Sequence, residues 1–98
     1  MPQYFFDTRD GPELLRDEEG LELDGIQQAR DEAARGLLDL ARDLIPGSES
    51  RELAIEVRDR RNVPLLRAAL SFEVAVLAGL RIALLTTPSP EGGAHEPR

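Results

Sequence analysis

The chain of 98 residues has no cysteine and only one histidine, His95. Without cysteine neither a disulfide nor a thiolate metal site can form, and a zinc site needs more than one histidine. Nucleophilic catalysis by serine needs a base within reach, usually histidine, and His95 stands in a tail rich in proline and glycine. These absences predict no catalytic residue, no metal and no cofactor, and we expect the protein not to be an enzyme.

Phosphate-binding patterns and long apolar runs are missing too. Neither G-x-G-x-x-G nor G-x-x-x-x-G-K occurs. The longest apolar stretch, residues 74–85, is too short to span a bilayer and contains Arg81. The first residues lack the basic segment and apolar run of a signal peptide. We therefore expect a cytoplasmic protein that does not enter a membrane.

Lysine is also absent, and the net charge of −7 is unevenly spread: residues 1–24 carry −6, residues 25–50 carry −2 and residues 51–98 carry +1. An acidic first third opposes the capture of nucleic acid by charge alone. The acidic run Asp17–Gly20 lacks the alternating carboxylates of a calcium loop, so it is predicted to be a solvated turn. We do not expect nucleic acid as a partner.

The central segment, residues 24–46, is predicted to be one amphipathic helix. Its apolar residues recur at steps of three and four, at Ile26, Ala29, Ala33, Leu37, Leu40, Ala41, Leu44 and Ile45. Asp24 is the predicted N-cap, with Gln27 reaching back as in a capping box. Pro46 and Gly47 should end the helix. Gly36 either lets a strand approach closely or is merely tolerated.

Two strands are expected before this helix, at residues 3–8 and 13–17, joined by an Asp10-Gly11 turn that is typical of hairpins. Alternation sends Phe5 to one face of the sheet and Tyr4 and Phe6 to the other. We interpret these aromatic side chains as packing residues. Residues 21–23 alternate again and lead into the helix.

Two further strands are expected after the helix. Residues 52–58 alternate between a buried face and an exposed one. The buried face carries Leu53, Ile55 and Val57, and the exposed face carries Glu52, Ala54, Glu56 and Arg58. After a turn at residues 59–62, Pro64 begins the fourth strand, where a missing N–H is tolerated. The apolar side of the helix should pack on Leu53, Ile55 and Val57.

These elements predict an α+β fold, with an antiparallel four-stranded sheet, one covering helix and the order ββαββ, over a domain of residues 1–77. Residues 78–87 are predicted to be an apolar extension, either a strand or a short helix, because periodicity does not separate the two. Residues 88–98 are predicted to be a disordered tail.

The chain combines an aromatic opening at Met1–Phe6, an Asp10-Gly11 turn, a second turn at Asp17–Gly20 and a helix with repeated alanines such as Ala33-Ala34. In this combination residues 1–74 resemble a family of short bacterial proteins catalogued as a domain of unknown function. The resemblance implies no catalytic residues. The order of elements is also similar, more remotely, to HicB-type antitoxins, which neutralise a small RNA-cleaving partner.

Four arginines surround the second hairpin: Arg58, Arg60, Arg61 and Arg67. They form either an ordinary solvated hairpin tip or a contact patch for an anion, RNA or a protein partner. A free sheet edge and the apolar segment after Val76 favour a non-enzymatic protein-interaction module, with a homodimer as one form. The alternative is a HicB-like antitoxin-type partner that binds and inhibits a small basic RNA-cleaving toxin, since an acidic surface supplies charge complementarity.

Overall fold

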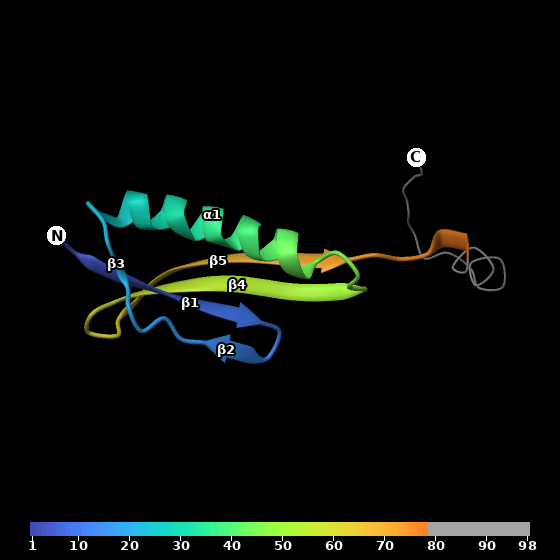
Figure 1. The fold of residues 1–98 in the computed structure, drawn as a ribbon, viewed down its shortest axis with the longest axis horizontal. Coiled ribbons are helices and arrows are strands. Elements are labelled where there is room, and N and C mark those ends of the chain that lie inside the picture. Colours follow the sequence, from blue (N-terminus) through green and yellow to red (C-terminus); the bar gives the residue numbers. More distant parts are fainter. Residues whose placement is uncertain (79–98) are drawn as a thin grey trace, which may run out of the picture.

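The computed structural model describes residues 1–78 (Figure 1). Its elements are β1 (Gln3–Asp10), β2 (Glu13–Leu15), β3 (Leu21–Glu22), α1 (Ile26–Leu44), β4 (Ser50–Asp59) and β5 (Pro64–Glu73). All strand pairs are antiparallel, in the order β2-β1-β4-β5, and β3 pairs with β1 at the end opposite to β2. The predicted α+β class is confirmed. The sheet has five strands rather than four, because residues 21–22 pair with β1.

The hydrophobic core lies between α1 and one face of the sheet, mainly over β4 and β5 (Figure 1). Its buried apolar side chains are Tyr4, Ala29, Ala33, Leu37, Leu53, Ile55 and Val57. The predicted packing of the helix on β4 is therefore confirmed. A β-carbon at Gly36 would lie 2.9 Å from Cδ1 of Ile55, so this glycine does permit a close approach of helix and strand. Ile26 was expected in the core but is 46% exposed.

The start of α1 differs from the predicted capping box. Gly25 is the N-cap residue, in an extended conformation, and no side chain caps the helix. Asp24 therefore lies one residue too early to act as the cap. Its backbone N–H donates to Oε1 of Gln28 at 2.9 Å, so the residue that reaches back is Gln28 and not Gln27. The helix ends at Leu44, shortly before Pro46 and Gly47, as expected.

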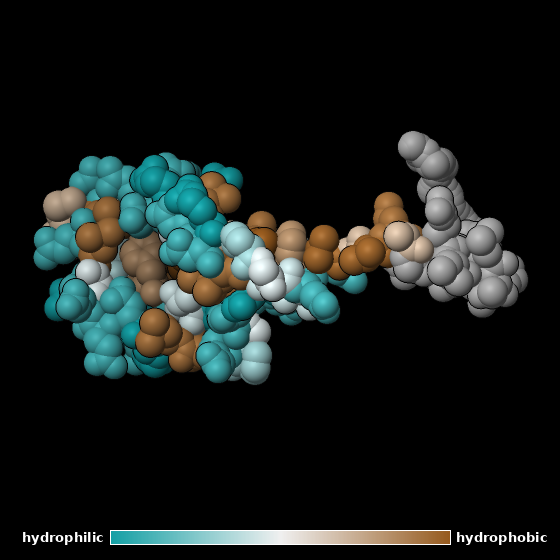
Figure 2. All heavy atoms as spheres, turned by 45° about the vertical axis from the view of Figure 1, so that its right-hand side comes forward, coloured by the Kyte–Doolittle hydropathy of each residue, from teal (hydrophilic) through white to brown (hydrophobic). Residues whose placement is uncertain are grey.

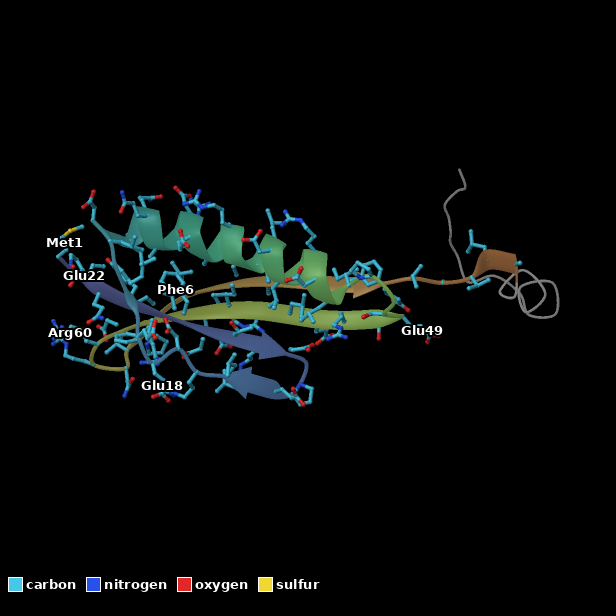
Figure 3. The ribbon with its side chains drawn as sticks, in the orientation of Figure 1. Met1, Phe6, Glu18, Glu22, Glu49 and Arg60 are labelled. Atoms are coloured by element: carbon cyan, nitrogen blue, oxygen red, sulfur yellow. The ribbon has the colours of Figure 1, made fainter. Side chains whose placement is uncertain are left out.

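The sheet face opposite α1 has no layer over it in the described part of the chain. Phe5 lies on this face and Tyr4 and Phe6 lie on the helix side, as alternation predicted; Figure 3 shows Phe6 between helix and sheet. Ala54 was expected to be exposed here, yet it is only 1% exposed. Its cross-strand neighbours Arg9 and Ala69 stand on either side of it, which explains the burial of so short a side chain.

Candidate functional site

A buried ion pair joins β1 to β4 on the open face of the sheet. Nε of Arg58 donates to Oδ2 of Asp7 at 2.9 Å, and the two side chains are only 14% and 8% exposed. The same guanidinium donates to the carbonyl oxygen of Asp17 at 2.7 Å and to Oδ1 of Asn62 at 3.0 Å. It also lies 4.7 Å from the ring centre of Phe5, a cation–π distance. Arg58 is thus held by contacts within its own chain.

Asp17 holds the loop between β2 and β3 against β1. Its Oδ2 accepts from the backbone N–H of Phe6 at 3.0 Å, and its Oδ1 accepts from the N–H groups of Glu19 and Gly20 at 3.1 and 3.2 Å. Its own N–H donates to Oδ1 of Asp7 at 2.9 Å. The carboxylate therefore takes the place of a neighbouring strand at the middle of β1, where neither β2 nor β3 pairs with it.

Both carboxylates are held in the charged form. Burial by itself would raise the pKa of Asp7, but the hydrogen bonds from Arg58 and from the N–H of Asp17, together with the positive charge of Arg58, lower it overall. Burial also opposes ionisation of Asp17, but three backbone N–H donors lower its pKa below the usual value. Asp7, Arg58 and Asp17 form a charged internal clamp, which we call the β1 clamp.

A second ionic group, centred on Glu56, lies on the same face of the sheet. Oε2 of Glu56 accepts from Nε of Arg9 at 2.9 Å and from Nε of Arg67 at 3.1 Å. Each of the two arginines donates a hydrogen bond through Nε alone, and their terminal nitrogens have no hydrogen-bond partner within residues 1–78. Arg67 is 57% exposed, and it stands on the edge strand of the sheet.

The other two predicted arginines, Arg60 and Arg61, lie at the β4–β5 turn. They line an open hollow of about 630 Å³ together with Pro2, Gln3, Tyr4, Asp59 and Leu65. Figure 3 shows Arg60 at the same end of the molecule as Met1. The N–H groups of Val63 and Arg61 donate to Oδ1 of Asp59, which lowers its pKa and fixes the turn. The four arginines are therefore distributed over three places: the β1 clamp, the Glu56 group and the turn.

The outer edge of β5 has no strand beside it in the described structure. The N–H of Val74 donates at 2.9 Å to the carbonyl of Glu49, the residue just before β4. In an antiparallel pair every second residue turns both backbone groups toward its partner. Counting back from Val74, the even-numbered residues face β4. From Leu66 onward, where the register with β4 is regular, the outward N–H and C=O groups therefore belong to Arg67, Ala69, Ser71 and Glu73.

An apolar segment continues from the end of β5. Val74, Val76 and Leu77 are 53%, 74% and 72% exposed. Figure 1 shows this segment leaving the sheet in the direction of β5, and Figure 2 shows it as a projecting row of hydrophobic residues. We call residues 74–77 the apolar arm. Apolar surface of this kind, in line with an open strand edge, is typical of a protein-binding surface.

No group of three or more His, Asp or Glu side chains that could hold a metal ion occurs within residues 1–78. In the same range no helix is long and apolar enough to cross a membrane. The extension is predicted at residues 78–87, and all of it after residue 78 lies outside the described residues, as do His95 and the predicted tail at residues 88–98.

Sequence reasoning gave no structural role to the carboxylates of Asp7 and Asp17. Asp7 stands in a strand between aromatic and polar residues, and Asp17 begins an acidic turn, so neither position differs in the sequence from a solvated acid. One signal is present: Asp17 precedes Gly20 by three residues, the spacing of a side-chain-capped turn. The position of β5 at the edge of the sheet was not predicted either, because short-range pattern does not give strand order.

A family model described as a domain of unknown function (DUF6894) matches residues 3–71, and this confirms the resemblance to a domain of unknown function. No curated protein and no solved structure matches the chain.

Proposed function

Because the chain belongs to the DUF6894 family, a domain of unknown function, we infer its role from its own surface, and we propose that it is a non-enzymatic, cytoplasmic protein-interaction module. The observation that carries the proposal is the outer edge of β5. This strand is ten residues long, and its outward backbone groups have no strand beside them within residues 1–78. Such an edge binds an added strand through main-chain hydrogen bonds.

The two edges of the sheet differ in length. β2 has three residues and β3 has two, and short edge strands are a common protection against pairing with other chains. β5 has a proline only at its first residue, Pro64, and its register with β4 is regular from Leu66 onward. Proline and bulges that would block strand addition are therefore absent from the described outer edge beyond Leu65.

The charges on the open face favour a protein partner over nucleic acid. Acidic side chains stand among the basic ones there: Asp7 pairs with Arg58, and Glu56 pairs with both Arg9 and Arg67. A surface that binds phosphates needs basic residues without acids between them. Under this proposal Arg67, Arg60 and Arg61 remain candidate contacts for acidic groups of a partner, while Arg58 acts through the β1 clamp.

The test replaces a single outward N–H of β5. Ala69→Pro removes the donor that an added strand would use, and the site is exposed, so the monomer should still fold. Ala69→Thr is the matched control, because it changes the same residue but keeps the N–H. Tagged full-length chains, expressed in the cells that make the protein, would be purified under mild conditions, with thermal unfolding to check that each variant folds.

We expect wild type and Ala69→Thr to retain the same stoichiometric partner chains, whether identical to the bait or different from it, and Ala69→Pro to lose them. Equal retention by Ala69→Pro would show that partners do not use this edge. A wild-type chain that retains nothing would contradict the module itself.

An antitoxin-type role is the second candidate function. It is favoured by three exposed acids around β3, Glu18, Glu19 and Glu22, none of which forms an ion pair within the described residues. Such a surface complements a small basic RNA-cleaving toxin. If a gene for a small basic protein lies beside this one, co-expression should relieve its toxicity, and the variant with all three acids changed to glutamine should relieve it less. A solitary gene counts against this role.

A further inference from the structure

We propose that the strand added at the β5 edge comes from a second copy of this chain, with two β5 strands antiparallel about a twofold axis and Leu70 opposite Leu70 of the partner subunit. The inference rests on the proposed function, since it names the partner of the same edge. It is carried by three observations: the outward backbone groups of β5, the charges at its two ends and the apolar arm.

Backbone geometry restricts the register. Hydrogen bonds across the new pair can form only between outward-facing residues, which in the regular part of β5 are Arg67, Ala69, Ser71 and Glu73. Two registers that satisfy this rule pair most of the regular stretch, residues 66–73. One puts Ala69 opposite its own symmetry mate and Arg67 opposite Ser71 of the partner subunit. The other puts Leu70 opposite its mate and Arg67 opposite Glu73 of the partner subunit.

The charges favour the second register. Arg67 uses Nε for Glu56 and keeps its two terminal nitrogens free of hydrogen bonds within residues 1–78. Glu73 is exposed and forms no ion pair in the same range. Cross-strand pairs of opposite charge stabilise a sheet, and the first register, with Arg67 opposite Ser71, gives neither Arg67 nor Glu73 such a pair. The twofold axis produces the Arg67–Glu73 pair twice.

The helix-side residues of β5 fit the same register. Ala68 faces Phe72 of the partner subunit, so the smallest apolar side chain of the strand meets the largest. Both residues are half-buried in the single chain, as is Leu70, so pairing would bury what α1 leaves exposed. A twofold axis perpendicular to the sheet keeps both helices on one side of it.

One flank of α1 adds apolar surface beside this edge. Leu40 lines a hollow with Thr8 and Leu15 and therefore lies on the β1–β2 side of the helix. Leu38 is two residues away, about 200° around the helix axis, so it lies on the opposite flank, above β5. Leu38 is 59% exposed. Its symmetry mate would face it across the axis.

In the same arrangement the apolar arm lies beside the start of the partner's β5. In the Leu70 register, Val74 lies opposite Leu66 of the partner subunit, the last residue before the irregular step at Leu65. The arm would therefore continue the added strand along the start of the partner's β5. In the single chain this row of residues projects from the sheet (Figures 1 and 2), so a second copy covers apolar surface that its own fold does not.

The test uses charge reversal at the paired positions in the full chain. Glu73→Arg sets two arginines opposite each other, and Arg67→Glu sets two glutamates opposite each other. When the two variants are mixed, both pairs become complementary again. The matched control is Glu52→Arg, which makes the same charge change on the same face of the sheet but on β4, away from the edge. Sedimentation equilibrium measures self-association, and thermal unfolding checks each fold.

We expect wild type and Glu52→Arg to dimerise, each charge-reversed variant alone to dissociate at least about tenfold more readily, and the equimolar mixture to recover the dimer. A Glu73→Arg variant that dimerises as well as wild type, or a mixture that fails to recover, would overturn the register. A wild-type chain that stays monomeric at its highest soluble concentration would overturn the homodimer. That result would leave the proposed module standing, because a different partner lost by Ala69→Pro would still be retained by the wild type.

Discussion

Replacing Arg58 by methionine should destabilise the fold more than any other single arginine substitution among residues 1–78. Methionine keeps most of the length of the side chain but removes the guanidinium. Its loss leaves the carboxylate of Asp7 buried without a countercharge, and it removes the hydrogen bonds to the carbonyl of Asp17 and to Asn62. The loop between β2 and β3 then loses one of its attachments to β4.

The expected size follows from burial. Breaking a buried ion pair by removing one partner costs about 3–5 kcal/mol, because the remaining charge is uncompensated. The free energy of unfolding of a small domain is roughly 5–15 kcal/mol, so Arg58→Met should remove a large share of it. Arg42 and Asp39 supply the comparison. Their N–O distance is also 2.9 Å, but their side chains are 73% and 69% exposed. Arg42→Met should cost only about 0.3–0.5 kcal/mol.

Urea unfolding of the wild type and both variants measures the difference, provided that the slope of the transition stays constant. The double variant Arg58→Met/Asp7→Asn should recover part of the loss, because neither charge is then left alone in the interior. The reasoning is refuted if Arg58→Met costs within about 1 kcal/mol of Arg42→Met, or if the two substitutions in the clamp are additive.

Two further outcomes follow from the same region. The free energy of unfolding should fall as the pH drops from about 5 toward 3. The reason is that the folded state holds the pKa of Asp7 and Asp17 below 3.8, so the unfolded chain takes up protons first. Urea midpoints measured across this range should change less in an Asp7→Asn/Asp17→Asn variant than in the wild type. Gly20→Ala should destabilise by more than the about 1–2 kcal/mol of a left-handed backbone, since φ is +75° and a β-carbon would lie 2.8 Å from Cε2 of Phe5. Gly11→Ala is its control in the same urea assay, because φ is +60° there but the space around it is open.

Much of this fold could be predicted from local pattern. The helical spacing of Ala29, Ala33 and Leu37, four residues apart, located the buried side of α1, and alternation located the buried side of β4. Both patterns are strong because each element has one face on a single core. The exact start of the helix could not be predicted, since Asp24 is a good N-cap residue by type and only the extended backbone at Gly25 moves the cap by one position.

The candidate site was less predictable, for a physical reason. Sequence reasoning grouped Arg58, Arg60, Arg61 and Arg67 by proximity along one hairpin. In the fold, Arg58 pairs with a carboxylate 51 residues away, while Arg60 and Arg61 lie at the turn. Long-range ion pairs leave no periodic trace in a sequence, so a buried arginine and a solvated one look alike there. Strand order, which makes β5 the edge, depends on the same long-range contacts.

The β1 clamp and the open edge of β5 together determine at which edge of the sheet a partner strand can bind. Along the outer side of β1, β2 covers one end, β3 covers the other, and the carboxylate of Asp17 accepts the N–H of Phe6 in between. A partner strand therefore finds that side occupied, whereas β5 offers ten residues with no comparable cover within residues 1–78. If the clamp covers the outer side of β1, loss of Asp17 should lower the stability of the fold but leave binding at β5 intact. Loss of the β5 N–H at Ala69 should instead weaken binding and leave the stability of the fold unchanged. That separation follows from their positions on opposite edges of one sheet, with β4 between them.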